Sequence, residues 1–232
     1  MIISSYQEST IDYPGKYGPI LFTQGCNFTC GFCHNPELAE LRDESVDNQK
    51  LLKDIKRKAK RGWYNGITIS GGEPTLQKDL PEFVKELKSY GLAIKLDSNG
   101  SNPEVLERLL EEGNVDYVAM DMKAPRERYQ GIVGDKVNLN KIDRSIELVK
   151  KFPMHEFRTT VLPFFSKENL EQMGEWVING TGKVKLYSVQ QFNPEKCFDK
   201  KYEKLIPKPK EEIESLGELM KNYSQEVRVL GL

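Results

Sequence analysis

Short runs rich in β-branched and apolar residues recur along the chain and alternate with longer amphipathic stretches. Six such runs occur, at residues 19–23, 66–70, 93–97, 117–121, 157–161 and 185–189. Runs of this length are typical of buried strands, and their alternation with helical patterns is typical of a parallel sheet. We therefore predict a parallel α/β sheet whose crossover connections are right-handed.

The stretches between these runs carry helix start and stop signals. Residues 102–104 supply an N-cap asparagine, a proline at the first helical position and an acidic residue in the first turn, and Gly113 stands where a C′ glycine belongs. Comparable signals predict helices over residues 79–91 and 166–180. Residues 51–61 predict an amphipathic helix whose basic face is solvated or, alternatively, docks an acidic partner.

The length of the chain limits the number of strands. At 232 residues, with a lead-in before the first run, eight strands with their helices exceed what the chain can supply. We therefore favour a partial (β/α)6 TIM-like barrel over an open doubly wound sheet. Residues 208–223 predict a C-terminal helical extension, and residues 227–230 are a candidate edge strand.

Composition narrows the class of protein. The chain has 38% hydrophobic and 30% charged residues and a formal net charge of −1, so it has no global field that attracts nucleic acid or an anionic membrane. No window approaches the apolar length of a spanning helix, and the N-terminus lacks the pattern of a signal peptide. We expect a cytoplasmic protein with reduced thiols and with neither nucleic acid nor membrane as a partner.

Polar or glycine-rich sequence follows most of the predicted strands. These segments include residues 24–26, 71–74, 97–100, 121–123 and 190–192. Because the site of a parallel α/β fold lies at the carboxyl ends of its strands, we expect these segments to share one rim. His155, by contrast, precedes the fifth predicted strand on the opposite rim, and we expect it to be structural.

Three of the four cysteines follow the first strand with the spacing C-x3-C-x2-C, at Cys26, Cys30 and Cys33. Structural zinc needs four ligands, and the candidate fourth, His34, is adjacent to Cys33 and poorly placed for the same ion. The match of residues 30–34 to the haem-attachment pattern C-x-x-C-H requires an exported chain and leaves Cys26 without a role. A thioredoxin-like redox pair is disfavoured because a third cysteine intrudes.

An iron–sulfur cluster suits the cysteines better. Cysteine thiolates normally ligate all four irons of a [4Fe–4S] cube, so three cysteines leave one iron open to bind a small molecule. Cys197 is a conceivable fourth ligand, but it lies beyond the last rim segment and is more typical of a loop cysteine. This spacing favours a catalytic cluster over an electron-transfer one.

The cysteine motif, with Phe32 before its last cysteine, and the segment Gly71-Gly72-Glu73-Pro74 together resemble the radical S-adenosylmethionine (SAM) superfamily. Residues 22–26, 33–36, 97–100 and 120–123 resemble its activating enzymes of glycyl-radical enzymes. The chain length and residues 11–15 and 190–192 are most similar to activating proteins of anaerobic ribonucleoside-triphosphate reductase. The resemblance implies a single domain over residues 1–232, with a core at about 16–194 and an extension at 195–232.

The resemblance also implies a set of site residues. Cys26, Cys30 and Cys33 would hold a [4Fe–4S] cluster whose open iron is chelated by SAM. The cofactor-binding residues would be Phe32 and His34 near the adenine, Gly71, Gly72 and Glu73 at the methionine end, and Asp97, Ser98, Asp121, Met122 and Lys123. Asp97, Ser98, Asp121 and Met122 match a monovalent-cation site, although Ser98 stands where a threonine is usual. Gln190 and Gln191 stand where a cofactor-contacting histidine is usual.

The implied activity is reductive cleavage of SAM at the cluster and abstraction of a hydrogen atom from a glycine of a partner enzyme. The expected partners are an anaerobic ribonucleotide reductase and a flavodoxin- or ferredoxin-like electron donor. The alternatives are an activator of another glycyl-radical enzyme, of the pyruvate formate-lyase type, or a zinc- or cluster-binding interaction protein without enzymatic activity.

Overall fold

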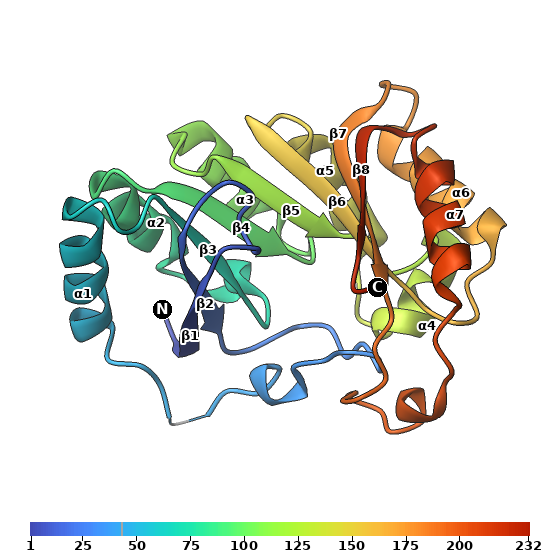
Figure 1. Ribbon diagram of the computed structural model, residues 1–232, viewed down its shortest axis with the longest axis horizontal. Helices are drawn as coiled ribbons and strands as arrows, with labels where there is room; N and C mark the ends of the chain where they lie inside the picture. Colours follow the sequence, from blue (N-terminus) through green and yellow to red (C-terminus); the bar gives the residue numbers. More distant parts are fainter. Residues whose placement is uncertain (43) are drawn as a thin grey trace.

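The structure is a computed structural model that describes residues 1–42 and 44–232. Within these residues, eight strands form one sheet in which neighbours in the sheet are also neighbours in the chain (Figure 1). The strands are β1 (Ile3–Ser9), β2 (Gly18–Thr23), β3 (Gly66–Gly71), β4 (Ala93–Ser98), β5 (Tyr117–Asp121), β6 (Met154–Val161), β7 (Val184–Gln191) and β8 (Ser224–Leu230). β1 runs antiparallel to β2, and every later neighbouring pair is parallel. In the described part of the chain, β1 and β8 are the free edges, so the barrel is not closed.

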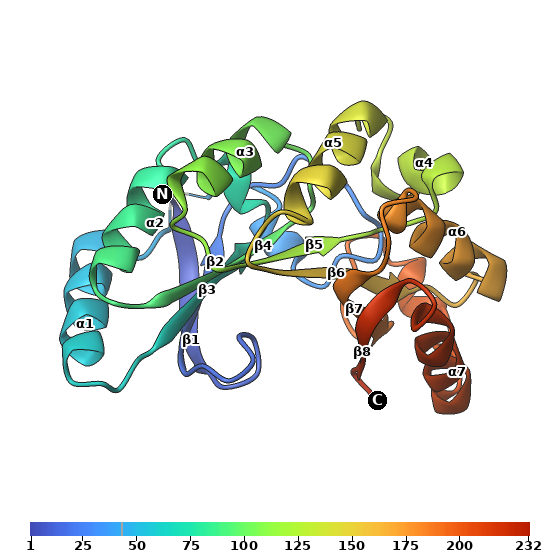
Figure 2. The same cartoon turned by 90° about the horizontal axis from the view of Figure 1, so that it is seen from above.

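The longer helices lie on the outer side of this sheet (Figure 2). They are α1 (Asn48–Lys60), α2 (Leu80–Ser89), α3 (Pro103–Glu112), α4 (Tyr129–Val133), α5 (Leu139–Val149), α6 (Lys167–Ile178) and α7 (Lys210–Met220). Gly113 ends α3 in the left-handed conformation, with φ 66°, as its position in the sequence predicts. None of the described helices has the length and apolar character needed to cross a membrane.

The two faces of the sheet differ in chemistry. The outward side chains of the strands, such as Ile69, Leu96 and Val118, belong to the large apolar core beneath the helices. The inward face holds only a small apolar cluster, and it buries several polar or charged side chains instead. These include Thr68, Lys95, Asp97, Glu156 and Ser188. Because buried polar groups need partners, this inner face is where interactions specific to the site are expected.

The six predicted strands correspond to β2 through β7, and the predicted α/β class and partial barrel are confirmed. The argument that the chain is too short for eight strands is wrong. The residues predicted as a lead-in form β1, which joins β2 as an antiparallel neighbour and needs no crossover helix. His155 also lies inside β6 rather than before it.

The C-terminal extension contains the predicted helix, and the candidate edge strand at residues 227–230 is confirmed. β8 follows α7 and pairs in parallel with β7, so residues 224–230 extend the sheet. The helix packs closely on the strand: a Cβ at Gly217 would lie 2.7 Å from a methyl carbon of Val229. The absence of a side chain at Gly217 therefore permits the close contact between α7 and β8.

Candidate functional site

The loop that follows β2 carries the three closely spaced cysteines. Gly25, with φ 89°, turns the chain away from the strand, and its N–H donates to the Leu38 carbonyl at 2.8 Å. Further along, the Thr29 N–H donates to the carbonyl of Val133 at the end of α4, at 2.9 Å. The loop is thus closed on itself and tied to a helix more than a hundred residues away in sequence.

Residues 195–205 lie against the outer side of the cysteine loop. The Asp199 N–H donates to the Gly31 carbonyl at 2.9 Å, and the Tyr202 ring packs directly on Gly31. A Cβ at Gly31 would collide with this ring, so glycine is needed between two of the cysteines. The segment that follows β7 therefore helps to fix the shape of the cysteine loop.

The cysteines are free thiols in partly or fully buried positions. Burial raises the pKa of Cys26 to about 11 and that of Cys30 to about 12, so both are protonated at neutral pH. Metals bind the thiolate, so binding here must release protons. Among the described residues, no three histidine, cysteine, aspartate or glutamate side chains are grouped closely enough to hold a single metal ion.

A cavity brings the cysteines together with the ends of β3, β4 and β5. Ten of the thirteen residues proposed from the sequence line it, and they come from separate strand ends. They are Cys26, Cys30, Cys33, Gly71, Gly72, Glu73, Asp97, Ser98, Asp121 and Lys123. The structure therefore gathers at one rim the segments that the strand-end argument assigned to it.

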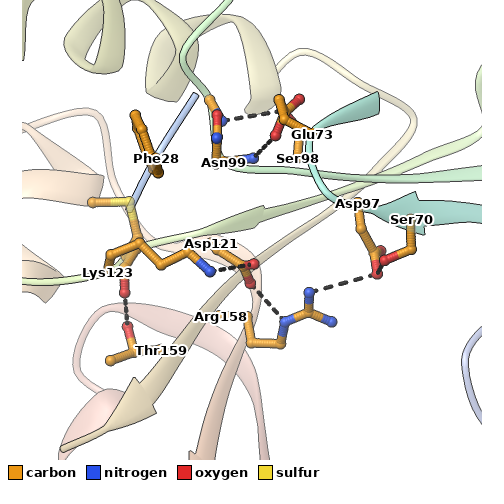
Figure 3. A network of polar contacts seen from close by, with 12 residues as sticks. Phe28, Ser70, Glu73, Asp97, Ser98, Asn99, Asp121, Lys123, Arg158 and Thr159 are labelled. Carbon is orange, nitrogen blue, oxygen red and sulfur yellow. Dashed lines mark hydrogen bonds and ion pairs between the residues drawn. The ribbon is translucent and has the colours of Figure 1, made fainter. Parts of the chain in front are cut away.

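Glu73 joins two of the loops that form this cavity (Figure 3). Its fully buried carboxylate accepts from the Ser98 hydroxyl at 2.8 Å through Oε1 and from the Asn99 N–H at 2.6 Å through Oε2. Oε1 also accepts from the Thr75 N–H at 3.1 Å. Burial raises the pKa of Glu73, and these donors oppose the rise. The three hydrogen bonds show that the carboxylate is engaged by the protein itself.

A second network crosses the inner face of the sheet, from Lys123 through Asp121 and Arg158 to Asp97 (Figure 3). Asp121 receives the Lys123 ammonium at 2.8 Å and Nε of Arg158 at 2.7 Å. The Arg158 guanidinium also donates to Asp97 at 3.5 Å. The two cations outweigh burial and lower the pKa of Asp121, and Asp121 raises that of Lys123. All of these groups are therefore charged at neutral pH.

Comparison with known proteins agrees with this geometry. The family model of the Radical SAM superfamily matches residues 20–177. The chain belongs to the radical SAM superfamily. A proposed glycyl-radical enzyme activating enzyme of Methanocaldococcus jannaschii is 37% identical over 228 residues, which cover 94% of this chain and 91% of that protein. This relative places the chain in the glycyl-radical enzyme activating family.

Two other similarities are more limited. The pyruvate formate-lyase-activating enzyme of Listeria monocytogenes is 37% identical over 123 residues, which cover 49% of each chain. The crystal structure of SuiB from Streptococcus suis bound to S-adenosylmethionine superposes with a TM-score of 0.66 at 17% identity, over 91% of this chain and 52% of that one. The structural match supports the fold alone.

Membership of the radical SAM superfamily implies a [4Fe–4S] cluster and SAM as cofactors. The residues present fit both groups. Three cysteines line the cavity, and thiolates are the usual ligands of such clusters. Charged and hydroxyl side chains also line it, and they suit a zwitterionic amino acid moiety.

The two glycines of this radical SAM site are required by packing of the protein on itself. At Gly72, a Cβ would lie 2.9 Å from the Leu38 carbonyl oxygen and closer still to that of Gly25. At Gly71, φ is 119° and a Cβ would collide with the backbone of Thr23. These glycines let β3 approach β2 and the cysteine loop, and both also line the cavity, as expected for residues at the methionine end of SAM.

Three residues proposed from the sequence do not line the cavity. Phe32 is buried with its ring 6.2 Å from that of Tyr202, and His34 lies 6.5 Å from the Phe192 ring. Met122 is fully buried in the apolar core. Burial lowers the pKa of His34. Of the two glutamines at the end of β7, Gln191 donates to the Lys208 carbonyl at 2.8 Å.

Several residues of the site were not predicted from the sequence. Phe28, Asn35, Ala39, Ser70, Asn99 and Phe198 line the cavity without having been proposed. Asn99 had a signal, because it stands between Ser98 and Gly100 at a strand end. Phe198 had no such signal in the sequence. It reaches the site because residues 195–205 fold back against the cysteine loop, which is distant in sequence. Arg158 carried a weaker signal, a charged residue within a strand of buried neighbours.

Proposed function

We propose that this radical SAM protein activates a glycyl-radical enzyme by abstracting a hydrogen atom from a backbone glycine of that partner. The observation that carries the proposal is the 37% identity to an activating enzyme over nearly the full length of both chains. The cysteine loop and the Gly-Gly-Glu segment also border one cavity. When bound, the cluster and SAM supply one-electron cleavage of the sulfonium and thereby hydrogen-atom abstraction.

In this proposal the chain's own residues bind and orient the cofactors. Cys26, Cys30 and Cys33 would hold three irons of the cluster and leave the fourth for SAM. Glu73, Gly71 and Gly72 would shape the methionine end. Further contacts would come from Asp97, Ser98, Asp121 and Lys123, with Phe32, His34 and Met122 behind them.

Lys123 has a specific electrostatic role in this proposal. Its ammonium lines the cavity with the cysteines, and its positive charge opposes the rise in the pKa of Cys30. A nearby cation favours the thiolate over the thiol. Because Asp121 keeps Lys123 charged, the lysine would lower the cost of deprotonating a buried ligand.

The partner we propose is an anaerobic ribonucleoside-triphosphate reductase, with a flavodoxin- or ferredoxin-like protein as the electron donor. Support comes from residues 11–15 and 190–192, which are similar to activating proteins of that reductase. The partial similarity to a pyruvate formate-lyase-activating enzyme makes that lyase the second candidate partner.

The activity is tested by anaerobic reconstitution with iron and sulfide, followed by addition of dithionite and SAM. We expect 5′-deoxyadenosine from the wild type and a loss of more than about 100-fold in Cys30→Ala, because the variant lacks an iron ligand. Cys197→Ala is the matched control, since Cys197 is also buried but does not line the cavity. No 5′-deoxyadenosine from a reconstituted wild type contradicts the proposed mechanism.

The partner is tested by electron paramagnetic resonance. The reduced protein and SAM are mixed separately with an anaerobic ribonucleotide reductase and with a pyruvate formate-lyase. A glycyl-radical signal in the reductase alone supports the proposed partner. A signal in the lyase alone replaces it with the second candidate, and no signal in either excludes both.

A further inference from the structure

Arg158 lies between the two aspartates that the sequence suggested as ligands of a monovalent cation (Figure 3). Asp121 on β5 is the register partner of Arg158 on β6, and Asp97 projects from β4 on the same inner face. Arg158 donates through Nε to Asp121 at 2.7 Å and through its terminal nitrogen to Asp97 at 3.5 Å. The guanidinium thus bridges two carboxylates from the neighbouring strands β4 and β5.

All four oxygens of these carboxylates accept from protein donors. Asp121 Oδ1 accepts from Arg158, and Oδ2 accepts from Lys123 at 2.8 Å. Asp97 Oδ1 accepts from the Lys95 ammonium, and Oδ2 accepts from the Ser70 hydroxyl at 3.1 Å as well as from Arg158. A hard cation needs several oxygen atoms directed at one point, and here each of these oxygens already accepts from an ammonium, guanidinium or hydroxyl group.

The two remaining groups of the expected cation site are engaged in the same way. The Ser98 hydroxyl donates to Glu73 at 2.8 Å and accepts from the Gly100 N–H at 3.1 Å. The Met122 carbonyl accepts from the Thr159 hydroxyl at 3.0 Å. A metal ion would therefore have to share each of its four expected ligands with an existing hydrogen bond.

The balance of charges also disfavours a bound metal ion at this position. Lys95, Lys123 and Arg158 face Asp97, Asp121 and Glu156 across the inner face, so the cluster is formally neutral. Lys95 is nearly fully buried, and the side chain of Asp97 is only 10% exposed. An added cation would leave a buried positive charge in excess, which is unfavourable without a further partner.

We propose that Arg158 is a positioning residue that replaces a bound alkali-metal ion with a covalently attached cation. It holds Asp97 and Asp121 in place beside Lys123, so this chain needs no monovalent cation at that position. The role of these aligned groups in binding SAM rests on the proposed function. The arrangement of charges does not depend on that function. The expected monovalent-cation site is in this view occupied by a side chain.

The first test uses the cofactor-free protein, so it does not depend on activity. Thermal unfolding is followed while KCl replaces tetramethylammonium chloride at constant ionic strength. We expect no saturable response from the wild type. In Arg158→Gln the freed carboxylates should bind K⁺ and raise the melting temperature by at least about 4 °C at saturation. Arg158→Lys keeps the charge and should remain insensitive to K⁺.

Arg108→Gln is the matched control. Arg108 also bridges two carboxylates, Glu82 at 2.7 Å and Glu112 at 2.8 Å, but it does so on the exposed surface. We expect no K⁺ response from this variant, since its carboxylates are solvated. A saturable response in the wild type, or a folded Arg158→Gln that does not respond to K⁺ or Na⁺, overturns the proposal.

The second test needs only the wild type and decides the question if Arg158→Gln does not fold. The affinity of the reconstituted protein for SAM is measured in KCl and in tetramethylammonium chloride. The proposal expects the two affinities to agree within twofold, and a tenfold loss without K⁺ contradicts it. A protein that binds SAM but yields no 5′-deoxyadenosine refutes the proposed function and leaves this result intact. If no SAM binds, the K⁺ titration of the cofactor-free wild type decides.

Discussion

His155 lies at the start of β6, away from the cavity, and is 5% exposed. Its Nε2 accepts from the Lys185 N–H of β7 at 3.1 Å. Burial lowers its pKa to about 4, whereas the unfolded chain binds the proton near pH 6.5. Its contribution to stability is therefore complete above pH 6.5 and is lost as the pH falls toward 4, by at most ~3 kcal/mol.

The variant His155→Gln keeps an acceptor near Lys185 but does not titrate. Denaturant unfolding from pH 7 to 4.5 should show a smaller loss of stability in the variant than in the wild type, by about 2 kcal/mol. If both proteins lose stability in parallel, His155 does not contribute to the pH dependence.

Substitution of Gly72 tests the packing beneath the cysteine loop. In Gly72→Ala the new methyl group collides with the carbonyl oxygen of Gly25, and neither backbone segment can move without disturbing a strand end. We expect a loss of about 3 kcal/mol in the free energy of unfolding. Gly131→Ala is the control, because nothing lies near a Cβ at that helical position, and it should be neutral or slightly stabilising. Equal stabilities in urea would show that the loop adapts.

At the scale of elements, residues 195–205 hold the cysteine loop from outside. Tyr202 contacts Gly31 and packs near Phe32. In the metal-free Tyr202→Ala variant we expect Cys30 to react with iodoacetamide at least about tenfold faster than in the wild type, since burial is what raises its pKa. Tandem mass spectrometry of the peptide that contains Cys30 measures the rate.

Tyr6→Ala is the control for this experiment, because Tyr6 is 44% exposed on the edge strand β1. Its substitution should leave the alkylation of Cys30 unchanged. If Tyr202→Ala behaves like Tyr6→Ala, residues 195–205 do not shield the thiol.

Elements with a strong internal pattern were predictable, and elements that depend on distant contacts were not. β2 through β7 were found because each is a compact apolar run, and α3 because Asn102, Pro103 and Gly113 mark its ends. β1 was not predicted because Ile3 is its one buried residue, so the strand lacks a hydrophobic face. The candidate strand at 227–230 had a pattern, but its pairing with β7 is set by the packing of α7.

At the scale of the whole molecule, the strand-end rule was sufficient to collect the cavity residues. It succeeded because the sheet follows chain order, so the carboxyl ends of β2 to β5 are neighbours. The strand-end rule did not predict which of these side chains face the cavity. Phe32 and His34 lie in the right loop but do not line the cavity, and they pack near Tyr202 and Phe192, which are remote in sequence. Likewise, two aspartates at strand ends suggested a metal ion, whereas only the register of β6 reveals Arg158 between them.

The chain-order sheet also has a consequence for how the protein is made. Because each strand pairs with its predecessor, the N-terminal units can assemble while the ribosome is still synthesising the rest. Asp199 and Tyr202 follow β7 in the chain, so their contacts with Gly31 form only after the cysteine loop and β2 to β7 have been synthesised. We therefore expect the nascent chain to pass through a stage in which its thiols are folded into their loop but still accessible to iron and sulfide.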